Sequence, residues 1–120
     1  MDNLLGNHIT TRIYLAGPRS LGDTATPEQY DKYTRQFSHH CAALRNKGFV
    51  VLNPCEVTKQ VSWELYMRLT LPMVCESDCV AVLPQWEKSR GSRLETFIAL
   101  ELGIPVIKVE ELYDGDEPTI

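Results

Sequence analysis

The chain has 120 residues, a length that is typical of one domain and sufficient to bury a core without disulfides or a structural metal. Its hydrophobic fraction of 43% and charged fraction of 23% are ordinary for a globular protein. The net charge of −4 argues against nonspecific binding to nucleic acid or to an anionic membrane as the main activity. No apolar run reaches the ~20 residues that a membrane span requires. We therefore expect neither nucleic acid nor a membrane as a partner.

The amino terminus and the cysteines bear on where the protein works. The first eleven residues lack the long apolar core of a signal peptide, which predicts a cytoplasmic protein. Cys41, Cys55, Cys75 and Cys79 form no C-x-x-C pair, and no histidine lies at zinc-site spacing from them. Each lies in or beside an apolar run, so we expect reduced, buried thiols, with no metal and no cofactor.

Four short apolar runs have the pattern of strands buried on both faces of a parallel sheet. They are Arg12–Ala16, Phe49–Leu52, Asp78–Leu83 and Pro105–Val109. Helical patterns lie between them, beginning at Thr26, at Ser62 (with a break or kink expected at Pro72) and at about Ser92. We divide the chain into an N-terminal extension (1–11), a domain (12–109) and an acidic tail (110–120) expected to be solvated or loosely packed.

Alternating strands and helices in one small domain predict an α/β fold with right-handed crossovers. We expect a three-layer, flavodoxin-like arrangement of about four parallel strands in the order 2-1-3-4, flanked by helices. In such a sheet the ligand binds outside the carboxyl ends of strands 1 and 3, where the chain direction reverses. The loops at residues 17–25 and 84–91 meet there, so both are candidate parts of a binding site.

The second of these loops has the composition of a phosphate-binding helix entrance. A helix amino terminus presents unpaired N–H groups and a partial positive charge, which suits an anion. Hydroxyl groups, close backbone approach at a glycine and arginine side chains would complete the cradle. The residues that would do so are Ser89, Arg90, Gly91, Ser92 and Arg93.

Glu95 has two interpretations at this stage. Ser92-Arg93-Leu94-Glu95 is an S-x-x-E pattern, so Glu95 is favoured as the partner of Ser92 in a capping box. Alternatively, its carboxylate faces the crevice from the first helical turn and reacts with a ligand.

Two aromatic residues also have two interpretations. Trp86 either packs on the end of the sheet, which we favour, or stacks on a base. Tyr14 is a core residue whose hydroxyl needs a ligand or a carboxylate as partner.

Four sequence blocks carry a family resemblance: Ile13–Pro18, Gly48–Pro54, Trp63 with Tyr66–Arg68, and Leu83–Glu95, which contains WEKSRGSRLE. Together they resemble an uncharacterised phage and bacterial family allied to the nucleoside 2-deoxyribosyltransferases. The resemblance covers about residues 12–109. It implies a flavodoxin-like fold and cleavage of an N-glycosidic bond to deoxyribose, either by transfer of the sugar or by hydrolysis of a deoxynucleoside 5′-monophosphate.

The resemblance also implies roles for single residues. Glu95 corresponds to the catalytic nucleophile, Tyr14 to a catalytic strand tyrosine and Ser89 to a phosphate-binding serine. Related enzymes complete their sites with a neighbouring subunit, which implies a homodimer or a higher homo-oligomer. The ligand-binding set that we expect for a nucleotide or nucleoside is Gly17, Pro18, Arg19, Trp86, Ser89, Arg90, Gly91, Ser92 and Arg93.

Arg19 is one residue out of step with the loop arginine of the related enzymes, and the bulkier Arg93 replaces their small residue two before the glutamate. The most important departure is at residue 70. Where they carry a catalytic aspartate, this chain has Thr70, which cannot act as a base or hold a charge. Either another carboxylate such as Glu64 or Glu87 substitutes, or catalysis is lost. The first hypothesis is therefore an N-glycosidase or deoxyribosyltransferase that acts on a (deoxy)nucleotide through Glu95. The second is a non-catalytic nucleotide-binding or sensor module, and the third is a phosphoribohydrolase of a modified base or a dinucleotide.

Overall fold

The structure is a computed structural model that describes residues 11–19, 26–57 and 61–113. Most of the predicted N-terminal extension lies outside these ranges. So do residues 20–25 of the first candidate loop and the last seven residues of the predicted tail.

The four strands form one parallel sheet in the order β2-β1-β3-β4, which confirms the predicted topology. Tyr14, in the middle of the sheet, lies opposite Leu52 on one side and Val80 on the other. The strands are β1 (Arg12–Ala16), β2 (Val50–Leu52), β3 (Cys79–Val82) and β4 (Val106–Lys108).

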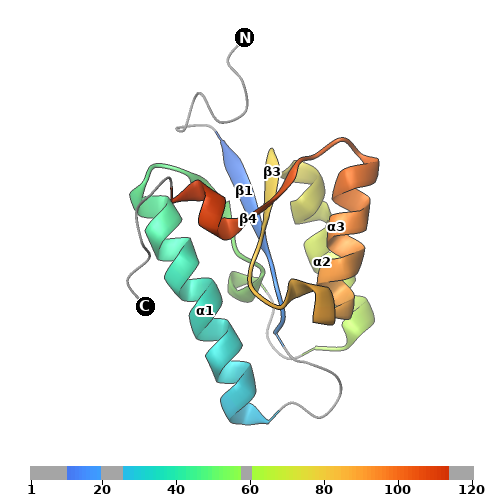
Figure 1. Cartoon of the computed structure of the whole chain (residues 1–120). Coiled ribbons are helices and arrows are strands. Elements are labelled where there is room, and N and C mark those ends of the chain that lie inside the picture. Colours follow the sequence, from blue (N-terminus) through green and yellow to red (C-terminus); the bar gives the residue numbers. More distant parts are fainter. Residues whose placement is uncertain (1–10, 20–25, 58–60, 114–120) are drawn as a thin grey trace.

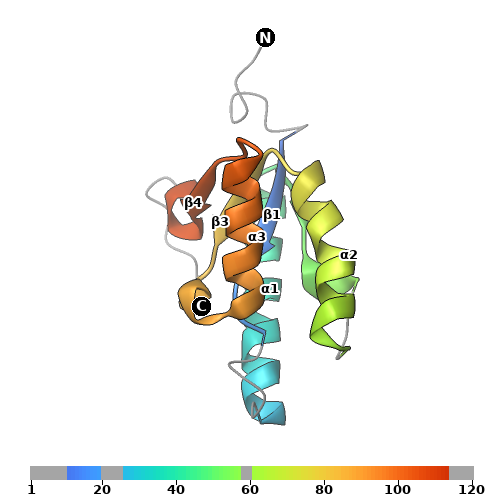
Figure 2. The ribbon, with the colours of Figure 1, turned by 90° about the vertical axis from the view of Figure 1, so that its right-hand side faces the viewer.

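Helices cover both faces of the sheet, so the molecule has three layers. Helix α1 (Pro27–Asn46) lies on one face, and α2 (Trp63–Glu76) and α3 (Arg90–Glu101) lie side by side on the other (Figures 1 and 2). Alternate residues of β1 serve the two cores, because successive strand side chains point to opposite faces. Ile13 belongs to the core under α1, whereas Tyr14 belongs to the core under α2 and α3.

The ends of α1 follow from its sequence. The Thr26 hydroxyl accepts a hydrogen bond from the Gln29 N–H, and the Gln29 side chain accepts one from the Thr26 N–H, so the predicted capping box is present. Beyond the helix, Gly48 has a φ of 98°, a left-handed conformation that favours glycine.

Helix α2 begins where the sequence predicts but does not break where expected. The Ser62 hydroxyl caps it by accepting a hydrogen bond from the Leu65 N–H. The helix then continues through Pro72 to Glu76, which corrects the expected interruption. Pro72 is on the exposed side, and burial of Val74 on the inner side holds the last turn against the sheet.

The strands β1 and β3 end side by side at the carboxyl edge of the sheet. The Leu83 N–H donates a hydrogen bond of 2.8 Å to the Ala16 carbonyl, which joins the two loops that leave these strands. A Cβ atom at Gly17 would lie 2.8 Å from the Leu83 Cβ, so this close approach requires a glycine. The amino-terminal ends of α2 and α3 lie at the same edge (Figures 1 and 2).

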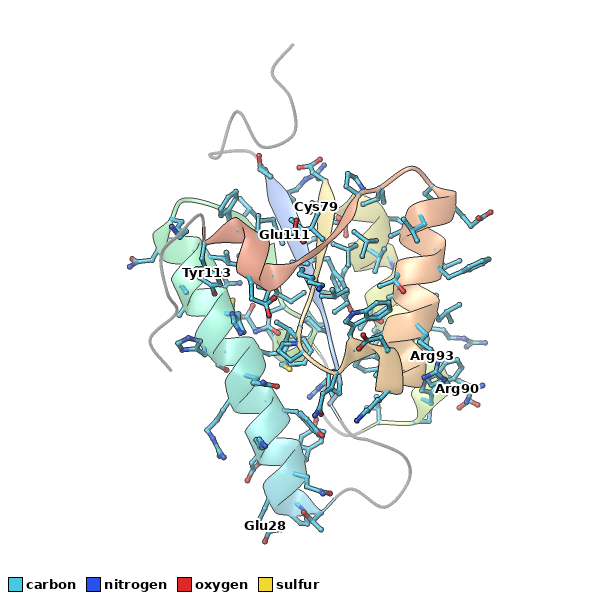
Figure 3. The ribbon with its side chains drawn as sticks, viewed as in Figure 1. Glu28, Cys79, Arg90, Arg93, Glu111 and Tyr113 are labelled. Atoms are coloured by element: carbon cyan, nitrogen blue, oxygen red, sulfur yellow. The ribbon has the colours of Figure 1, made fainter. Side chains whose placement is uncertain are left out.

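Three short 3₁₀ helices complete the described chain: η1 (Pro54–Glu56), η2 (Trp86–Lys88) and η3 (Val109–Leu112). The predicted acidic tail starts inside η3, where Leu112 and the following Tyr113 are buried in the core under α1. The Tyr113 hydroxyl lies 2.7 Å from Nδ1 of His40 on α1, and Figure 3 shows Tyr113 beside that helix. The first four residues of this segment are therefore part of the folded domain, contrary to the expected loose packing.

The thiols differ in exposure, although all four are free. Cys41 and Cys79 are buried as expected and Cys55 is half-buried, but Cys75 is exposed because it lies on the outer side of α2. Among the described residues, no group of three metal-ligating side chains is placed to hold a metal ion. Within the same ranges, no helix is both long and apolar enough to cross a membrane.

Candidate active site

A carboxylate is buried between α3 and the sheet. Glu95 lies in the second turn of α3, and its side chain is 1% exposed. Its Oε2 accepts a hydrogen bond of 2.5 Å from the hydroxyl of Tyr14, which is fully buried in the middle of β1. A separation this short is typical of a hydroxyl bound to an ionised carboxylate. The carboxylate is one of the two partners predicted for the Tyr14 hydroxyl.

Burial dominates the acid–base behaviour of this pair. It raises the pKa of Glu95 to about 7, and the neighbouring Tyr14 and Thr70 hydroxyls only partly counter the shift. The pKa of Tyr14 lies well above its ordinary value, first because of burial and then because of the Glu95 charge. Glu95 therefore exchanges its proton much closer to neutral pH than an ordinary glutamate does, and shifts of this kind are common in functional sites.

Two residues of α2 complete what we call the Glu95 cluster: Tyr14, Tyr66, Thr70 and Glu95. Thr70 is 0% exposed and affects the pKa of both Tyr14 and Glu95. Burial, followed by the Glu95 charge, raises the pKa of the half-buried Tyr66. Three segments distant in sequence therefore converge on one carboxylate.

The capping interpretation of Glu95 is wrong. The residue that caps α3 is Ser89, whose hydroxyl accepts a hydrogen bond of 3.2 Å from the Ser92 N–H. The helix thus begins at Arg90 rather than at about Ser92. This earlier start moves Glu95 to the second turn, whereas the alternative interpretation placed it in the first turn facing the crevice. The side chain instead points inward, where it meets Tyr14.

The residues predicted to hold a phosphate gather at the start of α3 but differ in position. Ser89 and Ser92 are buried, and Gly91 lies against α2, where an added Cβ would be 3.2 Å from Sδ of Met67. Arg90 and Arg93 are exposed and project from the side of α3 that faces away from the sheet (Figure 3).

These two arginines already have neighbours within the chain. The Arg90 guanidinium lies 3.6 Å from the ring centroid of Trp63 at the start of α2, a close cation–π stack. Arg93 donates a hydrogen bond of 2.9 Å to the Glu87 carbonyl. The Arg90–Trp63 stack therefore joins the starts of α2 and α3 at the carboxyl edge of the sheet.

The loop after β1 is buried rather than open. Gly17, Pro18 and Arg19 are all buried. Arg19 donates a hydrogen bond to the Tyr30 hydroxyl on α1, and its Cζ lies 5.6 Å from the ring centroid of Tyr66. Arg19 thus reaches the edge of the Glu95 cluster through Tyr66.

The loop after β3 contains an unusual backbone conformation. Gln85 has a φ of 68°, in the left-handed region that few residues other than glycine adopt. The next residue, Trp86, is half-buried and packs against the core under α2 and α3, which favours the packing interpretation over a base-stacking role.

Sequence patterns alone did not assign Tyr66 or Trp63 to the site. Both lie on the face of α2 that also carries Met67 and Val74, where an aromatic residue is usually a core residue. The available signal was their spacing: Trp63, Tyr66 and Thr70 repeat at intervals of three and four, so one inner helix face carries three polar atoms.

The sequence matches one protein family, described as a domain of unknown function (DUF4406), over residues 11–108. This match covers most of the chain and all four strands of the sheet. The chain therefore belongs to the DUF4406 family. No curated protein matches it.

Proposed function

We propose that this DUF4406 protein cleaves the N-glycosidic bond of a nucleotide, by hydrolysis or by transfer of the sugar, with Glu95 as the nucleophile. The observation that carries the proposal is the buried Glu95–Tyr14 pair, with its 2.5 Å hydrogen bond and a Glu95 pKa of about 7. The resemblance to the nucleoside 2-deoxyribosyltransferases supports the same assignment.

The chemistry follows from the pair. Because Tyr14 binds Oε2, we assign the attack on the anomeric carbon to Oε1 of ionised Glu95. A carbon–oxygen bond forms as the carbon–nitrogen bond breaks, and the base leaves with the electron pair and takes a proton from water. Water or a second base then displaces Glu95 from the sugar, so the two displacements retain the anomeric configuration. A pKa well above its ordinary value makes Tyr14 a hydrogen-bond donor that positions Glu95, rather than a source of the proton that the base requires.

Because the Glu95 side chain is 1% exposed, we assign substrate entry to a separation of α2 and α3 at their starts. The Arg90–Trp63 stack and the contact of Gly91 with Met67 lie across this route. A nucleotide phosphate offers Arg90 a stronger, charge-assisted partner than the Trp63 ring. We therefore assign the phosphate to the side chains of Arg90 and Arg93 and to the N–H groups of Arg90 and Gly91, because the Ser92 N–H is already bound by the Ser89 hydroxyl.

Release of free base tests the proposal. The protein is incubated with the common ribonucleoside and deoxyribonucleoside 5′-monophosphates, and base is followed by chromatography. We expect release by the natural protein and by Glu101→Gln, an exposed control at the end of α3, but not by Glu95→Gln. Because the nucleophile must be ionised, the rate should rise as pH increases through about 7. Release that Glu95→Gln leaves unchanged contradicts the assignment.

One observation favours a second candidate, a nucleotide-binding module without turnover. Thr70 supplies no charge where the related enzymes carry an aspartate, and the Glu95 side chain is almost fully buried. This candidate predicts thermal stabilisation by a nucleoside monophosphate without release of base. Stabilisation combined with Glu95-dependent release excludes it.

We also propose that the protein forms a homodimer through the outer surface of α2 and α3. Phe97 and Leu100 of α3 are 59% and 63% exposed, and Leu65 and Leu69 of α2 are also exposed, as expected for an interface. The molar mass in solution should be that of a dimer and should fall to that of a monomer in Phe97→Asp. A monomeric natural protein contradicts this proposal.

The four free thiols support a cytoplasmic location, which we propose as well.

A further inference from the structure

We infer that the Glu95 cluster binds the sugar through its neighbouring hydroxyl groups, so that the ligand is a ribonucleotide rather than a 2-deoxyribonucleotide. The inference rests on the proposed function for the location of the ligand, but it does not require turnover.

The first observation is an unused hydroxyl. Thr70 is 0% exposed, and within the described part of the chain its Oγ1 makes no hydrogen bond of normal geometry. It lies near Glu95 and Tyr14 and lowers the pKa of both, but only through side-chain hydrogen bonding that falls short of normal geometry, so a better-placed partner would be accepted. A buried hydroxyl without a partner costs about 1–3 kcal/mol, and such groups are rare in folded proteins. Valine would have nearly the same shape without this cost, so the hydroxyl points to a missing partner.

A second unused hydroxyl lies on the facing helix. Ser92 is 1% exposed, and its Oγ has no hydrogen-bond partner among the described residues. Ser92 is three residues before Glu95, so the two side chains are neighbours on the buried surface of α3. The inner surfaces of α2 and α3 therefore present two neutral hydroxyls beside one carboxylate.

The chemistry of these groups selects the ligand. A second anion is disfavoured beside Glu95, which places the phosphate outside, at the exposed arginines. Threonine and serine hydroxyls each donate and accept, and the carboxylate accepts. The adjacent 2′- and 3′-hydroxyls of a ribose offer two donors and two acceptors that match this set. A 2-deoxyribose has only one of these hydroxyls and leaves a buried protein group without its partner.

Comparative binding tests the inference. Calorimetry measures the affinities of the four common ribonucleoside 5′-monophosphates and of their 2′-deoxy counterparts. One series uses Glu95→Gln, which prevents turnover during the titration, and a second uses the natural protein at low temperature. We expect each ribonucleotide that binds to do so about tenfold more tightly than its deoxy counterpart, the effect of one net hydrogen bond. Thr70→Val should abolish most of that ratio, whereas Thr70→Ser, which keeps the hydroxyl, should retain it.

A matched control separates this role from a structural one. Thr96 is also a buried threonine, on α3, but its hydroxyl donates a hydrogen bond of 3.0 Å to the Arg93 carbonyl, so Thr96→Val should leave the ratio unchanged. Should Thr70→Val fail to fold, Ser92→Ala is the second variant, with the same expected loss. A ratio of one in the natural protein overturns the inference. So does a ratio that both variants leave unchanged, since the hydroxyls would then hold an internal water only.

The experiments distinguish failure of this inference from failure of the proposed function. Glu95-dependent base release without a preference for ribose removes the inference and keeps the function. Preferential binding of ribonucleotides without base release keeps the inference and removes the function. Failure of every nucleotide to bind removes both.

Discussion

Replacing Glu95 by glutamine is expected to remove a pH-dependent loss of stability that the natural chain suffers between pH 4.5 and 7. Glutamine has nearly the same shape as glutamic acid and can still accept the hydrogen bond of Tyr14, but it does not ionise. In the natural protein, the burial that seals Glu95 favours the protonated form and raises its pKa from 4.5 to about 7. The two proteins should therefore resemble each other in acid and diverge as the pH rises.

The sign and the size follow from linkage. Between pH 4.5 and 7, the folded state keeps a proton on Glu95 that the unfolded state releases, so the free energy of unfolding falls as pH increases. The contribution is fully present below the unfolded pKa and is lost once the pH has passed the folded pKa of about 7. With 1.36 kcal/mol per pKa unit, the ionisation of Glu95 costs the natural protein roughly 3 kcal/mol at pH 8. Because part of this cost is already present at pH 5, Glu95→Gln should gain about 2.5 kcal/mol relative to the natural protein between pH 5 and pH 8.

Urea denaturation at pH 5, 6, 7 and 8 measures the difference directly. Glu101→Gln, on the exposed end of the same helix, reports any general effect of removing a carboxylate from α3. A constant difference between Glu95→Gln and the natural protein across this range would refute the reasoning. A natural protein that gains stability relative to the variant as pH rises would refute it more strongly, because hydrogen bonds to the carboxylate would then outweigh its burial.

Three further substitutions test other parts of the structure. Tyr14→Phe removes a hydrogen bond that lowers the pKa of Glu95, so an NMR titration of the carboxyl carbon should show that pKa rising further, with a stability loss of about 1–3 kcal/mol at pH 8. Gly17→Ala forces a Cβ to within 2.8 Å of the Leu83 Cβ and should lower the urea midpoint by the equivalent of about 1–3 kcal/mol; an unchanged midpoint would show that the loop yields. Thr26→Ala deletes the cap of α1 and should cost about 1 kcal/mol by the same measurement, and Thr26→Ser should restore it.

The sheet was predictable because its determinants are local. Each strand is a short run of mostly apolar residues, such as those from Cys79 to Val82, all four of which are buried. The turn signals Gly17-Pro18 and Asn53-Pro54 follow β1 and β2 directly. Once the strands and their crossover helices are recognised, the rules of handedness and the small number of strands leave few possible orders.

The site was less predictable because its partners are distant in sequence. The S-x-x-E pattern at Ser92 is local and favours a cap, but the hydroxyl that binds Glu95 comes from Tyr14, 81 residues earlier. The start of α3 was misplaced for a related reason, since Ser89 and Ser92 are both acceptable caps by sequence. Only the packing of α3 on the sheet decides which serine serves and which side chains face inward.

The end of the domain shows a similar limit. Acidic residues made the segment after Val109 look solvated, but composition averages over positions. Leu112 and Tyr113 are apolar anchors within that acidic segment, and both enter the core under α1. The burial of these two side chains therefore decides that the segment packs on the domain, whatever its mean charge.

The polar groups of the Glu95 cluster lower the stability of the folded chain, and the same groups bear on how a ligand reaches Glu95. A core of leucine and valine between α2 and α3 would be more stable than one that holds an ionisable carboxyl and the unused hydroxyls of Thr70 and Ser92. The same polar groups weaken the packing of the two helices, so separating them exposes groups that water solvates well. Separating α2 from α3 near Glu95 therefore costs less free energy than separating two helices with an apolar contact of equal area. A ligand that supplies hydrogen bonds to the Thr70 and Ser92 hydroxyls would stabilise the opened arrangement, so the same polar groups that lower stability would favour binding.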